Sequence, residues 1–170
     1  MSHPNIESSI INKRWIEELK KEPERFTIHD INTLYPDNKI DVFNEQALVE
    51  AHENLVLQFP FFWFNCPPLM KKWLDDVLTH GWAFGSQSGG VFMDKKVALA
   101  VSAGIEQKDY SEEGRYHYTL EQLLRPFETT FRYMGANYCS HFAFFGAEYE
   151  PSLEVIEQSA QEYKKFLTQI

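Results

Sequence analysis

The chain has 170 residues, of which 44% are hydrophobic and 15% aromatic, and this length and composition predict one globular domain over residues 1–170. The formal net charge of −9 argues against nucleic-acid binding, because contacts to phosphate backbones need clustered Lys and Arg. The sequence shows neither a signal segment nor an apolar stretch long enough to cross a membrane, so we expect a cytoplasmic protein.

Helix-like and strand-like segments alternate along the chain. We expect helices over residues 8–22, 44–51, 67–78, 119–134 and 151–167, strands over residues 25–31, 54–59, 96–102 and 136–145, and a loop over residues 32–41. Thr119 and Gln122 have the spacing of a capping box, and Pro126 predicts either a kink or a helix that restarts there. The alternation predicts an α/β fold in which helices cover both faces of a parallel sheet.

The two cysteines, Cys66 and Cys139, lack the spacing of a metal site or a disulfide framework, so we expect reduced thiols and no bound metal. Cys139 interrupts an apolar run and is predicted to lie in the core. Cys66 falls in a loop without an adjacent base, which favours a packing role over a nucleophilic one.

The segment from Asn54 to Gly85 is the most informative part of the sequence. An apolar strand over residues 54–59 runs into four consecutive aromatics, residues 61–64, and a helix begins behind Pro67-Pro68. Ligands of parallel α/β sheets bind at the carboxyl ends of the strands, and aromatic side chains are costly to leave exposed there. We therefore predict that a flat or apolar ligand covers this aromatic loop.

A second stretch with chemical potential lies at the N-terminus. Ser2-His3-Pro4-Asn5 and Ser8-Ser9 precede the first expected helix, whose unpaired N–H groups carry a partial positive charge. These residues either complete an anion site or form an ordinary helix start, and residue types alone favour the second interpretation.

Three further stretches leave two interpretations each. Residues 102–104 (Ser-Ala-Gly) either let backbone amides approach a planar ligand or form a simple turn. Tyr110 and residues 116–118 (Tyr-His-Tyr) either stabilise developing negative charge or are surface aromatics. Residues 80–85 form a second aromatic loop that either lines a ligand or covers the sheet. The glycine-rich motifs of dinucleotide and nucleoside triphosphate sites are absent from the sequence.

Together these features resemble the flavodoxin-like NAD(P)H:quinone oxidoreductases. The resemblance is closest to the small bacterial general-stress and modulator-of-drug-activity proteins and to the ancillary flavoproteins of glutathione-gated potassium efflux. It covers nearly the whole chain and rests on His3-Pro4 with Ser9 and Asn12, Phe59-Pro60 with Trp63-Phe64, Pro67-Pro68 and Lys72-Trp73, and residues 80–85. It implies a flavodoxin-like three-layer sandwich, FMN as cofactor with FAD as the alternative, ping-pong transfer of hydride from NAD(P)H to quinones, and a homodimer.

The resemblance also assigns residues to a flavin site. His3, Ser9, Ile10, Ile11 and Asn12 would hold the flavin phosphate, Pro60, Phe61, Phe62, Trp63 and Phe64 would run along the isoalloxazine ring, and Ser102, Ala103, Gly104 and Ile105 would form a third loop. Tyr110 and His117 would lie near the flavin carbonyl and act in catalysis.

Three departures from the family pattern are visible. The strand that directly precedes His3 in the family is absent, which implies either a truncated start or a sheet with a gap. Phe62 stands where the family often has Gln, which removes a side-chain donor to the ring edge. Residues 102–105 replace a Thr-Thr-Gly-Gly run that is usual in the family, so the backbone of the third loop has less of the conformational freedom that glycine gives.

Two other functions stay open at this stage. The first is a non-catalytic regulatory subunit of a cation-efflux transporter, which would contact the membrane only peripherally. The second is a one-electron flavodoxin-type carrier, which is disfavoured because the aromatic loops suit a bulky organic substrate.

Overall fold

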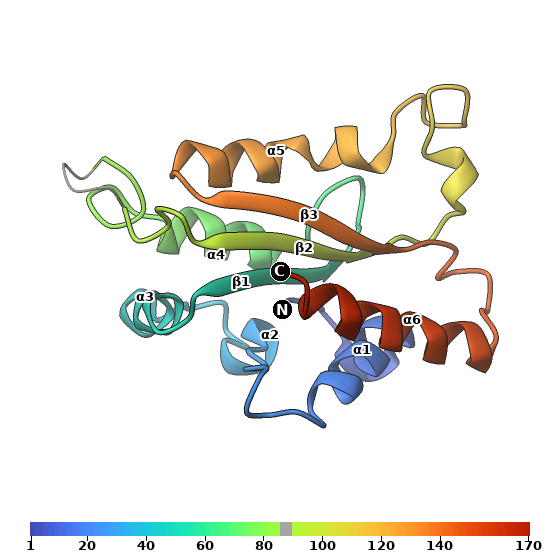
Figure 1. The fold of residues 1–170 in the computed structure, drawn as a ribbon, viewed down its shortest axis with the longest axis horizontal. Helices are drawn as coiled ribbons and strands as arrows, with labels where there is room; N and C mark the ends of the chain where they lie inside the picture. The colour runs from blue at the N-terminus through green and yellow to red at the C-terminus, as the bar shows by residue number, and fades with distance from the viewer. Residues whose placement is uncertain (86–89) are drawn as a thin grey trace.

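The computed structural model describes residues 1–85 and 90–170 (Figure 1). Within them the strands β1 (Asn54–Pro60), β2 (Lys96–Ser102) and β3 (Asn137–Phe144) form a parallel sheet in the order β1-β2-β3. The helices are α1 (Ile11–Leu19), α2 (Ile31–Leu34), α3 (Val42–Glu50), α4 (Pro68–Val77), α5 (Leu120–Tyr133) and α6 (Leu153–Leu167), with 3₁₀ turns η1 (Ile6–Ser8) and η2 (Gln107–Asp109). Among the described residues, none of the helices combines the length and the hydrophobicity that a membrane span requires.

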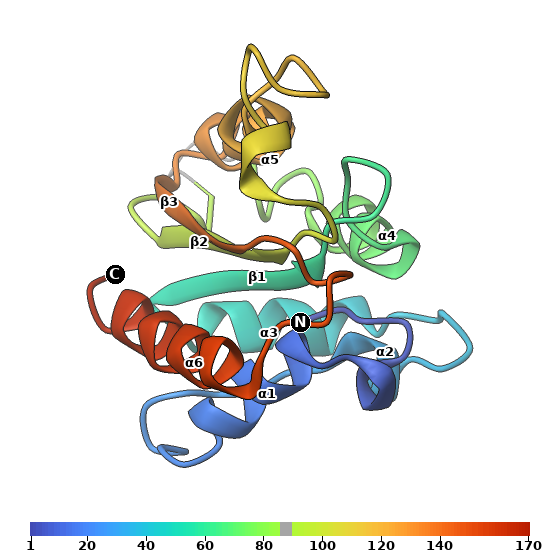
Figure 2. The same cartoon turned by 90° about the vertical axis from the view of Figure 1, so that its right-hand side faces the viewer.

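The sheet is the middle of three layers, with helices above and below it (Figures 1 and 2). On one face α4 and α5 pack on the strands, and the rings of Phe59 and Phe127 lie 5.3 Å apart. On the other face α1 packs against α6, where Trp15 is fully buried 4.8 Å from the Tyr163 ring. The predicted three-layer α/β sandwich with a parallel sheet is therefore confirmed.

Side-chain caps fix where several helices begin. The Thr119 hydroxyl accepts from the Gln122 amide while the Gln122 side chain accepts from the Thr119 amide, so the predicted capping box is present. Asp41 accepts from the Asn44 amide in the same way, which starts α3 two residues earlier than expected. α5 continues through Pro126, so the alternative of a helix restarting at that proline is wrong.

The strands differ in burial, and this difference corrects one prediction. β2 is the central strand, and its residues 97–101 are fully buried, as expected for a strand covered on both faces. β3 is an edge strand, and Cys139 is exposed rather than in the core. Cys139 is the unpaired residue of a bulge, because Tyr138 pairs with Val97 and Ser140 with Ala98. Cys66 is buried, which agrees with the packing role that the sequence favoured, and burial raises the pKa of its thiol to about 11.

The strand predicted over residues 25–31 is wrong. Residues 25–30 have no regular structure, and Ile31 begins α2. At its end this segment pairs with Met1, whose nitrogen donates to the His29 carbonyl and whose carbonyl accepts from the Ile31 amide at 3.1 Å. Along the rest of its length the segment faces a cavity, so its apolar alternation has no strand to pair with.

A buried carboxylate joins α2, α3 and α4. Glu45 is 1% exposed, and its oxygens accept from His29 Nε2 at 2.7 Å, from the Tyr35 hydroxyl at 2.6 Å and from Trp73 Nε1 at 2.7 Å. Burial opposes ionisation of Glu45, but these hydrogen bonds outweigh it and hold its pKa below the ordinary value. The charged form of Glu45 therefore stabilises the folded state.

Glu45→Gln is expected to lower the free energy of unfolding by about 1–2 kcal/mol at neutral pH. A carboxyl group whose pKa is lower in the folded than in the unfolded protein stabilises the folded state at pH values above its unfolded pKa. This stabilisation disappears as the pH falls through the pKa that the group has in the folded protein. The loss caused by Glu45→Gln should therefore shrink on acidification, which urea unfolding at neutral and acidic pH measures. Glu50→Gln is the control, because the Glu50 bond to Trp82 Nε1 is exposed. A loss that stays constant with pH contradicts the prediction.

Candidate functional site

Three loops meet at the carboxyl end of the sheet. We call them loop 1 (residues 3–12), loop 2 (residues 60–67) and loop 3 (residues 102–106). Asn12 Nδ2 donates to Ser102 Oγ at 2.7 Å, which joins loop 1 to loop 3. The Phe61 amide donates to the Ser102 carbonyl at 2.8 Å, which joins loop 2 to loop 3. The structure thus brings together the three groups of residues that the sequence assigned to one site.

Loop 1 presents backbone donors at the start of α1. Ser9 Oγ accepts from the Asn12 amide at 3.2 Å and so satisfies one donor of the first turn. Among residues 1–85 and 90–170, the amides of Ile10, Ile11 and Lys13 have no hydrogen-bond partner. Free amides at a helix N-terminus carry a partial positive charge and bind anions. The backbone of loop 1, rather than its side chains, supplies this donor set.

His3 lies at the other end of loop 1. Its Nδ1 accepts from the Asn5 amide at 3.1 Å, and its ring meets Phe62 of loop 2 edge-on at 6.4 Å. Burial lowers the pKa of His3, so its ring is predominantly neutral at pH 7. His3 therefore contributes shape and a hydrogen bond to the site, not a positive charge.

Loop 2 holds two aromatic residues in the left-handed backbone region. Trp63 has a φ of 48° and Phe64 a φ of 61°. Phe62 and Asn65 exchange two backbone hydrogen bonds of 2.9 Å around them, which makes a tight turn of the kind that Asn-Gly favours. Trp63 is 93% exposed, whereas Phe64 is 41% exposed and its ring meets Tyr116 edge-on at 4.9 Å. Because packing does not explain the strain at Trp63, the turn has the character of a ligand-binding element.

Loop 3 begins with two buried residues and continues with backbone amides that have no partner. Ser102 and Ala103 are buried, and the following Gly104 and Ile105 are half-buried. A Cβ on Gly104 would lie 2.4 Å from the Glu148 carboxylate, so the glycine allows the segment after β3 to approach. Within the part of the chain that the structure describes, the amides of Gly104 and Ile105 have no hydrogen-bond partner. They are available to a ligand at the end of β2.

Tyr110 lies in an aromatic cluster at this end of the sheet. Its ring lies 6.4 Å from Phe61, 5.1 Å from Tyr116 and 5.4 Å from Phe145. Its side chain is buried, and burial raises the pKa of Tyr110 to about 12. The hydroxyl is therefore protonated at neutral pH and is a hydrogen-bond donor.

His117 is placed differently from Tyr110. It is exposed, has a φ of 59°, and its Nδ1 lies 3.2 Å from the Glu112 carbonyl. The contacts that hold the Tyr110 cluster together do not include His117. The structure therefore places both residues on the segment after loop 3 without joining their side chains.

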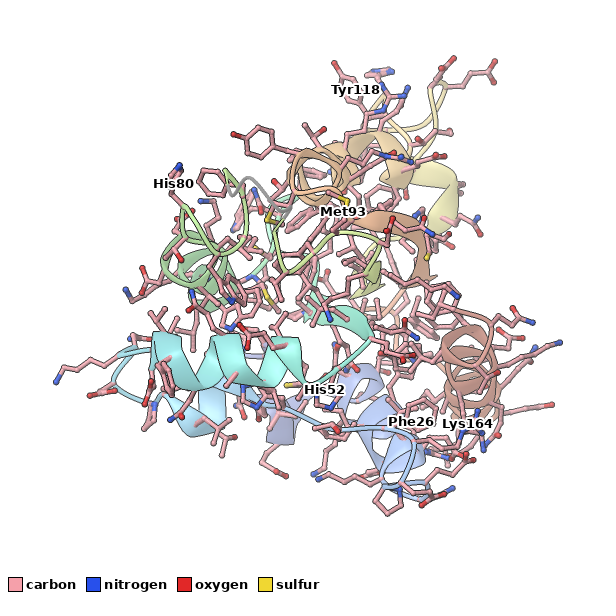
Figure 3. The ribbon with its side chains drawn as sticks, turned by 60° about the vertical axis from the view of Figure 1, so that its left-hand side comes forward. Phe26, His52, His80, Met93, Tyr118 and Lys164 are labelled. Carbon is pink, nitrogen blue, oxygen red and sulfur yellow. The ribbon has the colours of Figure 1, made fainter. Side chains whose placement is uncertain are left out.

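The second aromatic loop, residues 80–85, follows α4 and lies at the opposite end of the sheet from loops 1, 2 and 3 (Figure 1). Trp82 Nε1 donates to Glu50 at 2.6 Å, and Ala83 is fully buried. His80, labelled in Figure 3, meets Phe84 edge-on at 5.5 Å. Within one chain this loop covers the sheet and does not line the site, so it no longer favours one substrate class over another.

Two buried polar residues behind the site were not predicted. Gln58 Nε2 donates to the backbone and side-chain oxygens of Asn12 at 3.2 Å, and the Tyr163 hydroxyl lies 3.2 Å from Gln58 Oε1. This network ties loop 1 to β1 and α6. One signal was available in the sequence, because Gln58 is the single polar residue within the apolar run of residues 55–59.

A helix start with free amides, a strained aromatic turn and a third loop meet at the carboxyl edge of a parallel sheet, which is where α/β proteins of this architecture bind their ligands. The chain belongs to the flavodoxin-like fold family, whose sequence profile matches residues 1–167. The family that the sequence resembled is therefore confirmed.

Individual relatives extend this finding. An uncharacterized NAD(P)H oxidoreductase of Bacillus subtilis, YrkL, is 41% identical over 165 residues, which cover 97% of this chain and 93% of the relative. The crystal structure of general stress protein 14 of Treponema denticola in complex with FMN is similar with a TM-score of 0.93 and 44% identity, covering 99% of this chain and 95% of the other. The ancillary protein KefG of the glutathione-regulated potassium-efflux system of Cronobacter sakazakii is 31% identical over 166 residues, covering 98% and 89%.

Proposed function

We propose that this protein is an FMN-dependent NAD(P)H oxidoreductase that reduces quinones or similar aromatic acceptors. The observation that carries the proposal is the strained, exposed Trp63-Phe64 turn beside the free amides that start α1. A flat ring with an anionic tail fits an aromatic surface next to an anion site. The similarity to an FMN complex and to an NAD(P)H oxidoreductase supports the same conclusion.

The residues of loop 1 fit a phosphate group. The amides of Ile10 and Ile11 would bind phosphate oxygens, and Ser9 and Asn12 would hold the loop in the required shape. His3 would lie between the phosphate end and the ring end of the site, because it contacts Phe62. A doubly charged phosphate suits the positive end of a helix dipole.

Loops 2 and 3 fit the flavin ring. Residues 60–64 would supply the apolar wall, and residues 102–105 would supply backbone donors to the polar edge of the ring. When bound, FMN would accept hydride from NAD(P)H and pass it to the acceptor. The exposed face of Trp63 would hold the nicotinamide and then the acceptor in turn, which predicts ping-pong kinetics. FAD is the alternative cofactor.

Reconstitution tests this proposal directly. Purified protein incubated with FMN and desalted should stay yellow, and NAD(P)H should bleach the flavin absorbance until a benzoquinone restores it. Initial rates at varied NAD(P)H and quinone should give parallel double-reciprocal lines, as ping-pong turnover requires. Protein that stays colourless after incubation with both FMN and FAD refutes the proposal.

We propose that Tyr110 donates a hydrogen bond to negative charge that develops on the ring, with His117 as a second candidate. Tyr110→Phe is expected to lower the rate of flavin reduction about tenfold with little change in the Kd for FMN, because the aromatic packing is kept. His117→Ala should have a smaller effect, because that ring is exposed. Stopped-flow reduction by NADPH measures both variants, and equal rates for Tyr110→Phe and wild type contradict the role of Tyr110.

A regulatory subunit of a cation-efflux transporter is the second candidate function, and the similarity to KefG favours it. It predicts co-purification with a membrane transporter from detergent extracts and no oxidation of NAD(P)H by the flavin-loaded protein.

We also propose a homodimer, because Trp63 and Phe62 expose apolar surface beside the site. Sedimentation equilibrium gives its mass.

A further inference from the structure

The carboxylate of Glu148 occupies the position in which a side chain on Gly104 would begin. A Cβ on Gly104 would lie 2.4 Å from Glu148 Oε1 and 2.5 Å from its Cδ, which is closer than non-bonded atoms approach. Gly104 belongs to loop 3, after β2, whereas Glu148 follows β3, and the carboxyl ends of these neighbouring strands lie together at one end of the sheet (Figure 1). The segment after β3 therefore places a carboxylate on a residue of loop 3 that has no side chain of its own.

Backbone hydrogen bonds hold this segment on loop 3. The amides of residues 146–148 donate to the carbonyls of residues 103–105 at distances from 2.9 to 3.1 Å. Among these bonds, the Glu148 amide donates to the Gly104 carbonyl at 3.1 Å. The backbone that carries the Glu148 side chain is therefore fixed beside loop 3.

The Glu148 carboxylate is available to a ligand. Glu148 is exposed, and among the described residues its carboxylate forms no ion pair and accepts no hydrogen bond. Glu106, at the end of loop 3, pairs instead with Lys108. The amides of Gly104 and Ile105 also have no partner in the described part of the chain. Loop 3 and Glu148 thus present two donors and one acceptor next to each other at the end of β2.

The charge of Glu148 also reaches Tyr110. Burial is the largest cause that raises the pKa of Tyr110 to about 12, and the charges of Tyr116 and Glu148 act in the same direction. The Tyr110 hydroxyl and the Glu148 carboxylate therefore lie at the same end of the site. Their effects on a bound ring are opposite, because a hydroxyl donor favours negative charge on the ring and a carboxylate disfavours it.

We propose that Glu148 is a specificity-determining residue of the flavin site, whose carboxylate accepts a hydrogen bond from the imide N–H of the isoalloxazine ring. This inference rests on the proposed function, in which loop 3 binds the polar edge of that ring. The imide edge carries one N–H between two carbonyl oxygens, so it needs an acceptor between donors. The free amides of loop 3 supply donors and Glu148 supplies the acceptor. Gly104 is bare because the carboxylate needs its place.

The first test compares FMN with N3-methyl-FMN, in which a methyl group replaces the imide hydrogen. Wild type should bind FMN about 30-fold more tightly than the methylated analogue, because a charge-assisted hydrogen bond is lost with the N–H. Glu148→Ala should reduce this preference to about threefold, mostly by weakening the binding of FMN. Glu150→Ala is the matched control, since this exposed glutamate lies two residues further along, and it should keep the preference of wild type. Quenching of flavin fluorescence measures all four affinities.

The second test uses the contact between the two residues. Gly104 lies outside the left-handed backbone region, so alanine fits its backbone, but the new Cβ would displace the Glu148 carboxylate. Gly104→Ala should therefore lose the preference for FMN as Glu148→Ala does. In the double variant Gly104→Ala/Glu148→Ala the second substitution should add little, because both remove one interaction. Thermal unfolding without flavin should give Tm values within about 3 °C of wild type for every variant.

The third test separates the charge of Glu148 from its role as an acceptor. Glu148→Gln keeps an acceptor oxygen, so the preference for FMN over N3-methyl-FMN should stay within about threefold of wild type. Loss of the negative charge should tighten the binding of reduced FMN relative to oxidised FMN about tenfold, which corresponds to a rise of about 30 mV in the two-electron midpoint potential. A redox titration against a reference dye measures this potential.

Two results overturn the role of Glu148. One is an equal preference for FMN in wild type and Glu148→Ala, and the other is an unchanged midpoint potential in Glu148→Gln. Wild type that binds FMN and N3-methyl-FMN with equal affinity refutes the role of Glu148 but leaves the proposed function intact. Wild type that binds neither flavin refutes the proposed function and this inference together.

Discussion

Asn12→Ala is expected to weaken FMN binding about 100-fold and to lower the free energy of unfolding by about 2–4 kcal/mol. The Asn12 side chain is 1% exposed and bonds to Ser102 Oγ and Gln58 Nε2. Alanine would leave the Ser102 hydroxyl without its donor, reduce the bonds of Gln58 Nε2 to the one with the Asn12 carbonyl, and release loop 1 from loop 3. Thermal unfolding without flavin gives the stability loss, and quenching of FMN fluorescence on titration gives the affinity loss.

Ser102→Ala is the matched comparison. It removes one partner of Asn12 but leaves the bond to Gln58, so we expect a loss of about 1 kcal/mol and a smaller loss of FMN affinity. In the double variant Asn12→Ala/Ser102→Ala the two stability losses should be less than additive, because they share one hydrogen bond. Full additivity, or an FMN affinity that Asn12→Ala leaves unchanged, refutes this positioning role for Asn12.

Local signals predicted the architecture well. The Thr119–Gln122 capping box, the continuous apolar run of β2 and the helical face of Trp15 and Leu19 each depend on residues close in sequence, and each is present in the structure. The aromatic loop after β1 was also visible, because Pro60 and the following aromatics interrupt a strand pattern. Such features are decided by propensity and periodicity, which one sequence contains.

Other features depend on partners far away in sequence. Residues 25–31 alternate like a strand, but pairing needs a neighbour, and the neighbouring space is a cavity. Cys139 lies in an apolar run, but its position in a bulge of the edge strand leaves it exposed. The bond between Asn12 and Ser102 joins residues 90 positions apart, and no local pattern reports it. These features are determined by which distant segments the fold places side by side, and local sequence patterns do not show that.

The cavity and the candidate site are connected through Gln58. Its carbonyl accepts from Ser2 at the end of the cavity, while its side chain bonds to Asn12 of loop 1. Loop 1 begins at His3, directly after Ser2. Gln58 therefore holds loop 1 at both ends, through Ser2 and through Asn12.

Replacing Trp63-Phe64 by Asn-Gly is expected to raise stability and reduce function together. The left-handed region costs a bulky residue about 1–2 kcal/mol, and Asn-Gly is the sequence that this turn favours, so the free energy of unfolding should rise by about 1–3 kcal/mol. Loss of the aromatic wall should raise the Kd for FMN about 100-fold. Thermal unfolding without flavin and FMN titration measure the two effects.

Tyr133→Ala is the control for the Asn-Gly variant, because this exposed aromatic residue ends α5 at the amino end of the sheet. It should leave the Kd for FMN unchanged. If the Asn-Gly variant is more stable and binds FMN as tightly as wild type, the turn is strained for a reason other than flavin. If it is less stable, the exposed aromatics stabilise the free protein and the strain is offset within the chain. The expected result, higher stability with weaker binding, would show that the strained turn lowers the stability of the free protein because it holds the aromatic residues in the conformation that binds flavin.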